Sequence, residues 1–545
     1  MKYLKILIFC TAIGVILFTS CNKDKLKNLN INPQALNTID LNFLFTSAEL
    51  GVASSGSGGD NRFTDWRTNI GLAAGAIQQL GGPGGITNNG DKYLDNFEVN
   101  LFMDYTYPDQ LKNIGEILRQ SGPGGFAEGQ FQNTRQAARI LRAFIFERLT
   151  DFYGSIPYFE ALQAQEQVFF PHYDKQKDIY ADLLKEVEEA TAAFGTTDGG
   201  FAAADLYYNG DITKWKKFGY SLMLRMAMRV SYVDQAMANT YVAKAVAGGV
   251  FTSNADNTIV PMATGPSLWT SQNGISRAFI PGDGGEPTFL SQTLINFLKG
   301  ADTSTVADDD PRLMIISGGI GNWVDEATFV PITTDPLKQR GIPNGKSQAM
   351  LDQAAGLPSG TSLDLNKTYS KINVKLLQRD DPYMLMNYGE VELMLAEAAQ
   401  RSIGGLTPAQ AATHYDNGVR ASMQMYTIYD PSFVVSDPKV DAYLAIYPYN
   451  AATGLRMIGE QYWVNHFMNW YEAWTNWRRT TADPAAPNGY PVLVPVNYPG
   501  NVTGGKIFQR LKYPNSEIAG NPNFGSGSTK PNDYVTKVWW AGGPE

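Results

Sequence analysis

The sequence predicts a mainly α-helical protein made of consecutive helix pairs, with a loop-rich lobe and few short strands. Three observations predict this fold class. Apolar residues recur at helical spacing in several stretches between residues 37 and 250, and again between residues 382 and 480. Residues 251–381, which lie between them, are dense in Gly, Pro, Asp and Thr and show weak helical periodicity. Consecutive helices with short turns are typical of tetratricopeptide-like units, in which each pair buries an apolar face on its neighbour.

Five helices are predicted before the lobe. The strongest covers residues 134–152, where Ile140, Phe144 and Leu149 belong to one apolar stripe and Gly154 follows as a C-cap. Gly-Pro-Gly-Gly occurs twice, at residues 82–85 and 122–125, and marks loops on either side of a polar helical stretch. The five predicted helices cover residues 37–50, 134–152, 175–194, 213–232 and 235–247.

Within the lobe, the sequence predicts one helix, at residues 290–299. Long helices are predicted again after the lobe. They are expected at residues 383–401, 408–426 and 457–480. The last of these carries Trp463, Trp470, Trp474 and Trp477 at spacings that place all four on one helical face. We expect this stripe to lie in the core rather than to form a sugar-binding platform. The tail after residue 484 is rich in Pro, Gly and Asn and predicts an irregular segment.

Charged residues on these helices are expected to form ion pairs. Glu390 and Glu397 are seven residues apart and share a face. They could be a catalytic acid pair, but pairing with an arginine such as Arg225 or Arg420 is favoured. The predicted helix that ends with Arg478 and Arg479 also contains Glu472, and we expect these three to form buried ion pairs.

A removable signal and a lipid anchor are predicted at the N-terminus. Lys2 and Lys5 precede the apolar run 6–18, which is shorter than the roughly 20 residues that span a bilayer. Residues 17–21, Leu-Phe-Thr-Ser-Cys, resemble the lipobox of bacterial lipoproteins, although Phe18 stands where Leu is usual. We therefore expect residues 1–20 to be removed and Cys21 to carry lipid. Residues 21–36 are expected to be a flexible tether, and residues 37–545 a single unit with its helical scaffold at 37–250 and 382–480, a ligand lobe at 251–381 and a C-terminal segment at 481–545.

Composition narrows the class of function. The formal net charge is −9 and no Lys/Arg cluster is present, which argues against nucleic-acid binding. The 3 His residues are not spaced as in a zinc motif, and no Gly-x-Ser-x-Gly elbow occurs, so we expect neither a cofactor nor catalysis. The run Asp308-Asp309-Asp310 could supply oxygens to calcium, but it lacks the EF-hand spacing, and a solvated turn is favoured.

Four stretches in order along the chain resemble one known family. They are residues 149–158 (LTDFYGSIPY), residues 215–229 beginning with Trp-Lys-Lys-Phe, residues 388–398 beginning with Tyr-Gly-Glu, and residues 461–480 with YEAWTNWRRT at 471–480, followed by RLKYPNSE at 510–517. Together they resemble the SusD/RagB family of Bacteroidetes outer-membrane lipoproteins, in the branch with the Glu-Ala-Trp signature. The resemblance implies a lipid-anchored, non-enzymatic protein on the cell surface. It also implies a helical fold of tetratricopeptide-like pairs and a role as the lid of a SusC-like TonB-dependent transporter, to which glycans, or peptides in some members, are delivered.

Tryptophans outside the predicted helices are the candidate ligand contacts. They are Trp66 with Arg62 and Asp65 beside it, Trp269, and Trp323 after Asn322. Flat rings match the C–H faces of sugars, and the polar neighbours match the hydroxyl rim. Core packing or contact with the transporter is the alternative for each of these tryptophans. Two other functions stay open, namely peptide binding along the Gly-rich loops and hydrolysis by carboxylates that are distant in sequence.

Overall fold

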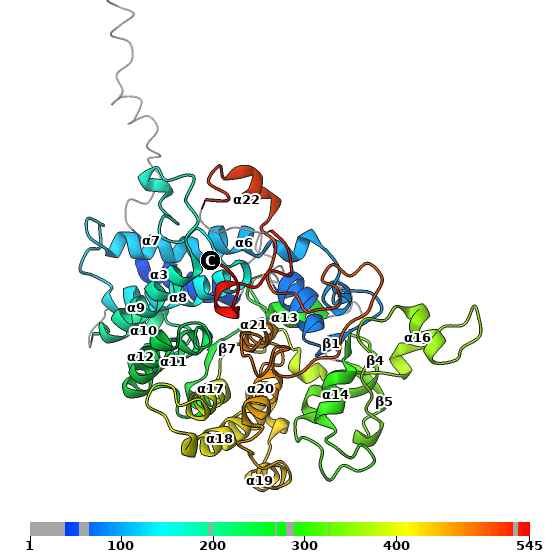
Figure 1. Ribbon diagram of the computed structural model, residues 1–545. Coiled ribbons are helices and arrows are strands. Elements are labelled where there is room, and N and C mark those ends of the chain that lie inside the picture. Colours follow the sequence, from blue (N-terminus) through cyan, green and yellow to red (C-terminus); the bar gives the residue numbers. More distant parts are fainter. Residues whose placement is uncertain are drawn as a thin grey trace, which may run out of the picture.

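The structure is a computed structural model, and the residues it describes are 39–53, 65–195, 200–266, 270–279, 288–325, 328–526 and 532–545. Helices make up most of it, and the strands are few and short (Figure 1). The predicted fold class is therefore confirmed. Cys21, Arg62 and Trp269 lie outside the described residues.

Packed helix pairs form the larger part of the molecule. α8 packs on α9, α11 on α12 and α17 on α18, and contacts of α9 with α11, of α11 with α17 and of α17 with α20 join the pairs into one row (Figure 1). These helices, with α3, α7, α19 and α21, have the following bounds: α3 Leu41–Ala53, α7 Lys112–Ser121, α8 Gln132–Tyr153, α9 Gln176–Ala192, α11 Ile212–Arg229, α12 Gln235–Gly248, α17 Tyr388–Gln400, α18 Ala411–Gln424, α19 Asp437–Ile446, α20 Gly454–Asn465 and α21 Trp470–Thr480.

Shorter helices and strands fill the remainder. The short helices include a π-helical segment, η2, and a 3-10 helix, η3, and their bounds are η2 Asp65–Ala74, α5 Asn88–Lys92, η3 Phe97–Asn100, α6 Phe102–Tyr105, α10 Phe201–Ala204, α13 Gly274–Phe279, α14 Gln292–Leu298, α15 Leu313–Ile316, α16 Gln348–Ala354 and α22 Asn515–Gly520. The strands are β1 Leu80–Gly81, β2 Thr258–Val260, β3 Phe289–Leu290, β4 Ser317–Trp323, β5 Phe329–Thr333, β6 Ser370–Ile372 and β7 Tyr383–Met386.

The strands connect the lobe to both halves of the scaffold. β5, β4 and β6 form an antiparallel sheet in that order inside the lobe. β1 pairs with β3 through Leu80 and Leu290, and β2 pairs with β7 through Thr258 and Met386. These two short ladders fix the lobe against the helix pairs, because each backbone pairing spans a long stretch of sequence.

Two helix predictions were wrong in extent. Residues 383–386 form β7, and the helix after it begins only at Tyr388, where the Asn387 side chain caps it by accepting from the N–H of Glu390 at 2.8 Å. Residues 457–480 are two helices, α20 and α21. Met468 between them has φ 78°, a left-handed conformation that ends a helix, and His466 Nδ1 bonds the carbonyl of Tyr462 at 2.8 Å.

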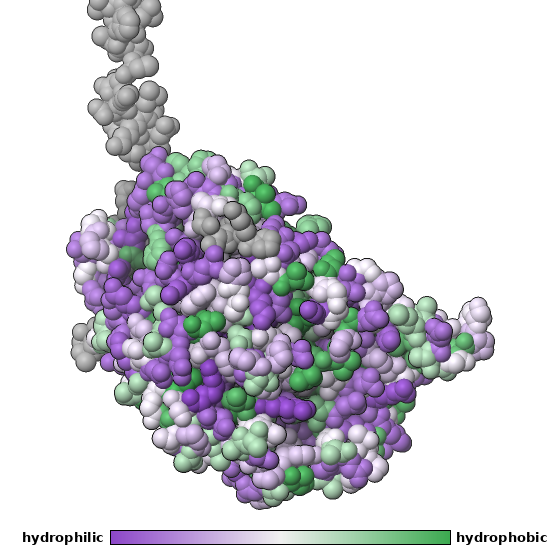
Figure 2. Space-filling model, viewed as in Figure 1, coloured by the Kyte–Doolittle hydropathy of each residue, from purple (hydrophilic) through white to green (hydrophobic). Residues whose placement is uncertain are grey.

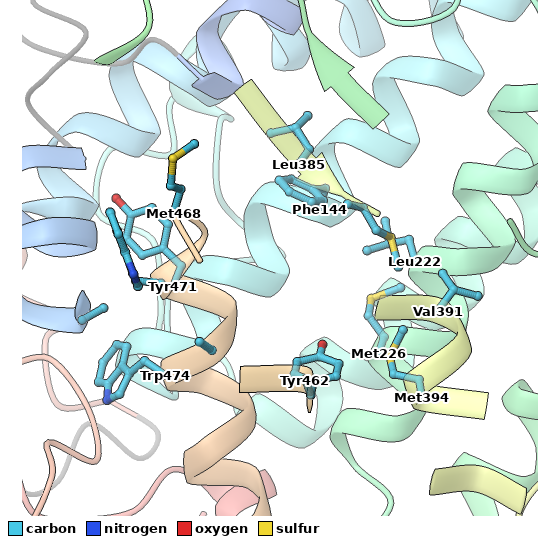
Figure 3. Close-up of a cluster of buried hydrophobic side chains, with 14 of the residues drawn as sticks. Phe144, Leu222, Met226, Leu385, Val391, Met394, Tyr462, Met468, Tyr471 and Trp474 are labelled. Carbon is cyan, nitrogen blue, oxygen red and sulfur yellow. The ribbon is translucent and has the colours of Figure 1, made fainter. Parts of the chain in front are cut away.

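One hydrophobic core runs through the helix pairs. Figure 3 shows side chains from α8, α11, α17, α20 and α21 meeting there, among them Phe144, Leu222, Val391 and Trp474. The four tryptophans of residues 463–477 are all buried. Their predicted place in the core is confirmed, although they come from two helices. A smaller cluster of Phe289, Ile342, Leu351 and Tyr369 lies in the lobe.

Buried ion pairs hold the helices together. Arg225 on α11 pairs with Glu147 at 2.8 Å and with Glu390 at 3.3 Å, which confirms the predicted partner of Glu390. Arg229, one helical turn later, pairs with Glu472 of α21 at 2.6 Å. The two arginines outweigh the burial of Glu472, which would raise its pKa, and lower that pKa to about 2.

The predicted pairing of Glu472 with Arg478 and Arg479 was wrong. Glu472 binds Arg229 instead of Arg478 or Arg479. Arg479 binds Glu397, and the Arg478 guanidinium donates to the carbonyls of Asp151 and Gln509 at 2.8 and 2.9 Å. Arg420 lies at the surface with Asp437 and Asp441. Arg479 and Arg420 pair with acids on neighbouring helices, and such partners cannot be read from spacing along one helix.

The acidic run is only partly a solvated turn. Asp310 is buried and pairs with the buried Arg312 at 2.6 Å, whereas Asp308 accepts from the N–H groups of Ala301 and Asp302 at 2.9 and 3.0 Å. Within the described ranges, no group of three or more His, Cys, Asp or Glu side chains could hold a metal ion.

The visible surface is mostly polar. On the face in Figure 2, hydrophilic residues predominate and apolar residues form small scattered groups. The part of the chain that the structure describes contains no helix with the length and apolar character needed to cross a membrane.

Candidate functional site at Trp66

Trp66 stands at the wall of a small pocket. Its side chain is half-buried at the start of η2, and the pocket encloses about 260 Å³. Three further polar residues line the same space, namely Asn89, Asn96 and Glu98. The lining as a whole consists of Trp66, Arg67, Gly71, Gly85, Ile86, Asn89, Asn96, Glu98 and Val99.

Asp65 holds Trp66 in place from inside the protein. Asp65 Oδ1 accepts hydrogen bonds from the Tyr383 hydroxyl at 2.9 Å and from Asn69 Nδ2 at 3.0 Å. Asn69 in turn donates to the carbonyl of Met468 at 3.1 Å and accepts from the N–H of Tyr471 at 3.0 Å. Burial raises the pKa of Asp65 to about 7. Asp65 was predicted as a ligand contact, but its side chain is buried and points away from solvent, so it positions the tryptophan instead.

Arg67 and Glu98 neutralise each other at the pocket. They form an ion pair across it, and the Arg67 guanidinium carbon lies 5.8 Å from the centre of the Trp66 ring. Glu98 is fixed by η3, which begins where Asn96 Oδ1 accepts from the N–H of Glu98 at 3.0 Å. The pocket therefore presents a ring, two amides and a balanced charge pair, a set that suits an uncharged polar ligand.

Gly71 allows the close backbone packing that forms one wall of the pocket. A Cβ atom at this position would lie 2.8 Å from the carbonyl oxygen of Trp66 and 3.3 Å from that of Ile86. Both neighbours are backbone atoms that cannot rotate away. Gly71 thus lets η2 approach the 85–86 turn closely enough to form one wall.

Trp323 and Asn322 lie at the end of β4, outside the lining of the Trp66 pocket. Asn322 is exposed and Trp323 is half-buried. The Trp323 ring packs edge-on against Phe279 of α13 at 6.4 Å, and α13 lies beside η2 (Figure 1). Its indole N–H is buried and has no hydrogen-bond partner among the described residues.

Most of the polar lining was not predicted from the sequence. Asn89, Asn96 and Glu98 were not among the candidates, because they follow Trp66 by more than twenty residues and carry no motif. The one signal that could have indicated them is the density of Asn and Asp between the first Gly-Pro-Gly-Gly loop and Phe97. Their convergence on Trp66 depends on the tertiary packing of η3 against η2.

Comparison with known proteins identifies relatives over nearly the whole chain. The SusD-like family model described as "Starch-binding associating with outer membrane" matches residues 37–514. A solved chitin-binding protein is 30% identical with a TM-score of 0.74, and the match covers 92% of this chain and 100% of that one. A Bacteroidetes SusD-like protein is 25% identical with a TM-score of 0.76 over 92% and 100% of the two chains. A SusD homologue from Bacteroides thetaiotaomicron is 22% identical with a TM-score of 0.65 over 93% and 100%. No curated protein matches the chain.

Proposed function

Because the chain belongs to the SusD-like family, described as starch-binding and associating with the outer membrane, we propose that it captures oligosaccharides at the cell surface. The observation that carries this proposal is the half-buried Trp66 ring, set among amides and a neutral charge pair. A sugar ring stacks its C–H face on such an indole and exchanges its water shell for the amides.

The pocket supports binding without chemistry. Hydrolysis of a glycosidic bond uses two carboxyl groups about 5 to 10 Å apart. In the pocket lining as described, Glu98 is the single carboxylate, and Arg67 neutralises it. At about 260 Å³, the pocket is smaller than the roughly 300 Å³ at which pockets for whole ligands begin. It therefore suits one sugar unit, while the remainder of an oligosaccharide lies along the surface.

The test is calorimetry with starch-derived and chitin-derived oligosaccharides, the two glycan types that the family and the 30% identical relative bring into question. Trp66→Ala is expected to weaken binding about tenfold or more, because stacking and burial of the ring are lost. Trp66→Phe should restore part of the affinity. Tyr241→Ala on α12 is a matched control with a half-buried aromatic residue outside the pocket. Binding that is unchanged in Trp66→Ala, or binding of peptides in place of glycans, would refute the proposal.

We further propose that Cys21 carries a lipid and that the partner is a SusC-like TonB-dependent transporter, with this protein as its lid. The family description and the lipobox at residues 17–21 support this placement at the outer membrane. A lipidated terminus confines the binder beside the transporter at high effective concentration. Cys21→Ala should leave affinity in solution unchanged and abolish retention on cells and uptake. Normal growth of that variant on the glycan would contradict the tethered-lid account.

A further inference from the structure

A second pocket, larger than the one at Trp66, lies between α14, α19 and α20. It encloses about 820 Å³ and is lined by a cluster of aromatic rings, which we call the tyrosine pocket: Phe297, Tyr415, Tyr443, Tyr447 and Tyr449. It shares no lining residue with the Trp66 pocket and is built by different elements. Figure 1 places α19 at the lower edge of the molecule, away from α13 and the η2 segment beside it.

The tyrosine hydroxyls are already bonded within the protein. The Tyr449 hydroxyl donates to Gln400 Oε1 at 2.6 Å. The Tyr447 hydroxyl donates to Asp308 Oδ2 at 3.1 Å and accepts from the N–H of Ala301 at 3.1 Å, and the Tyr443 hydroxyl accepts from Gln461 Nε2 at 3.0 Å. The three tyrosine rings are thus fixed at their tips. Tyr415 and Tyr443 are buried, so the half-buried rings of Phe297, Tyr447 and Tyr449 are the surfaces that the pocket offers to a ligand.

Two glycines give these rings their positions. A Cβ at Gly454 would lie 2.2 Å from the hydroxyl oxygen of Tyr449, and one at Gly300 would lie 2.6 Å from that of Tyr447. The rings also pack in two tilted pairs, Tyr415 with Tyr449 at 5.2 Å and Tyr443 with Tyr447 at 5.0 Å. A site preorganised in this way loses little conformational entropy on binding.

The polar groups around the rings indicate which chemistry fits. Asn296 and Asn450 contribute exposed amides, and the lining as described contains neither Lys nor Arg. Its one carboxylate, Glu460, is paired with Arg456 at 2.8 Å. The lining itself therefore offers a phosphate or carboxylate ligand no cation, and the adjacent Arg456 is already paired with Glu460. Ring faces with neutral amides at the rim match a neutral saccharide.

From these contacts we propose that the tyrosine pocket is a second saccharide-binding site. The inference rests on the proposed function, since it assigns the same class of ligand to a separate part of the protein. Its volume lies within the range of about 300 to 1,000 Å³ for ligand pockets, so it accommodates more sugar units than the Trp66 pocket. Two sites on one protein bind a long polysaccharide with avidity that neither site has alone.

The experiment measures the second site in the Trp66→Ala background, so that residual binding reports on the tyrosine pocket. Calorimetry with chitin-derived and starch-derived oligosaccharides should show a remaining weak association. Adding Tyr447→Ala should weaken it about fivefold to tenfold through loss of one stacking ring. Adding Tyr447→Phe, which keeps the ring and loses its bonds to Asp308 and Ala301, should weaken it less. In the otherwise unchanged protein, Tyr447→Ala should reduce retention on a polysaccharide gel by a similar factor, and Tyr241→Ala should not.

Ala451→Arg provides a variant that does not depend on removing a packed ring. Ala451 is exposed at the pocket wall, so a long side chain there fills the space without disturbing the core. It should abolish the residual binding of the Trp66→Ala protein. If the residual binding survives both Tyr447→Ala and Ala451→Arg, or if Trp66→Ala alone leaves none, the second site is refuted and the proposed function stands. If the unaltered protein binds no saccharide, both proposals fail.

Discussion

Glu397 is expected to be one of the strongest electrostatic contributors to stability, and Glu397→Gln tests this. Arg479 of α21 binds both carboxylate oxygens of Glu397, with Nη1 at 2.8 Å from Oε1, and Arg401 Nη1 lies 2.8 Å from the same Oε1. Burial alone would raise the pKa of Glu397, but the two arginines lower it to about 2. A fall from the ordinary 4.5 to about 2 corresponds to about 3 kcal/mol of stabilisation wherever the carboxylate is ionised in both states.

The substitution keeps the shape of the side chain and removes its charge. We expect Glu397→Gln to lower the free energy of unfolding by about 3 to 5 kcal/mol near neutral pH, because the buried Arg479 loses its ion partner. Urea denaturation followed by tryptophan fluorescence measures this quantity. Glu188→Gln is the control. It removes a pair with Lys244 at 2.7 Å whose side chains are 38% and 43% exposed, and it should cost less than about 1 kcal/mol.

The pH dependence gives a second check. A lowered pKa contributes stability that is complete above the unfolded value of 4.5 and is lost as the pH falls toward about 2. The difference between the unaltered protein and Glu397→Gln should therefore narrow by about half between pH 5 and pH 3. The role of this ion pair is refuted if the difference in free energy of unfolding stays constant on acidification, or if Glu397→Gln is as stable as Glu188→Gln. Either result would show that this ion pair does not fix α17 to α21.

The remaining predictions concern the core and the Trp66 site. Trp474→Ala should lower the free energy of unfolding by about 3 to 5 kcal/mol without a selective loss of binding, because its ring is buried and its N–H donates to the carbonyl of Phe508 at 2.8 Å; a stable variant that had lost only binding would contradict this. Gly71→Ala should shift η2 and abolish glycan binding, since its Cβ would clash with the Trp66 and Ile86 carbonyls, and calorimetry with Gly84→Ala as control, where a Cβ meets nothing within 4 Å, checks it. Asp65→Asn should flatten the pH dependence of stability. The raised pKa of Asp65, about 7, makes the unaltered protein less stable as the pH rises from about 4 to about 7, and equal slopes in urea titrations of both proteins would refute that role.

The fold could be predicted from sequence wherever a local pattern determined it. The apolar stripe of α8 and its Gly154 cap gave that helix nearly its true bounds, because periodicity and capping act within a few residues. The break between α20 and α21 could not be predicted in this way. The left-handed Met468 is held by a hydrogen bond between its carbonyl and Asn69, and that partner is 399 residues away.

In the candidate site, too, features set by local sequence could be predicted and features set by distant partners could not. Trp66 was found because a tryptophan outside the helical stripes is conspicuous. Asp65, its neighbour in sequence, was assigned to the ligand although it faces inward, because exposure depends on Tyr383 and Asn69 packing around it. The aromatic residues of the tyrosine pocket come from three separate segments, at residues 297, 415 and 443–449, so their shared cavity had no signature along the chain.

The hydrogen bonds that hold Trp66 link the first and last fifths of the polypeptide. Asn69 bonds Met468 and Tyr471, and Asn100, which follows the pocket residue Val99, donates from Nδ2 to the Tyr534 hydroxyl oxygen at 2.7 Å. During synthesis and export, residues 65–100 emerge long before these partners exist. This segment therefore cannot reach its final structure until those partners are present. Contacts between residues so far apart in sequence make its folding slow and late. A fragment that ended before α21 would carry Trp66 in its sequence and have no binding site.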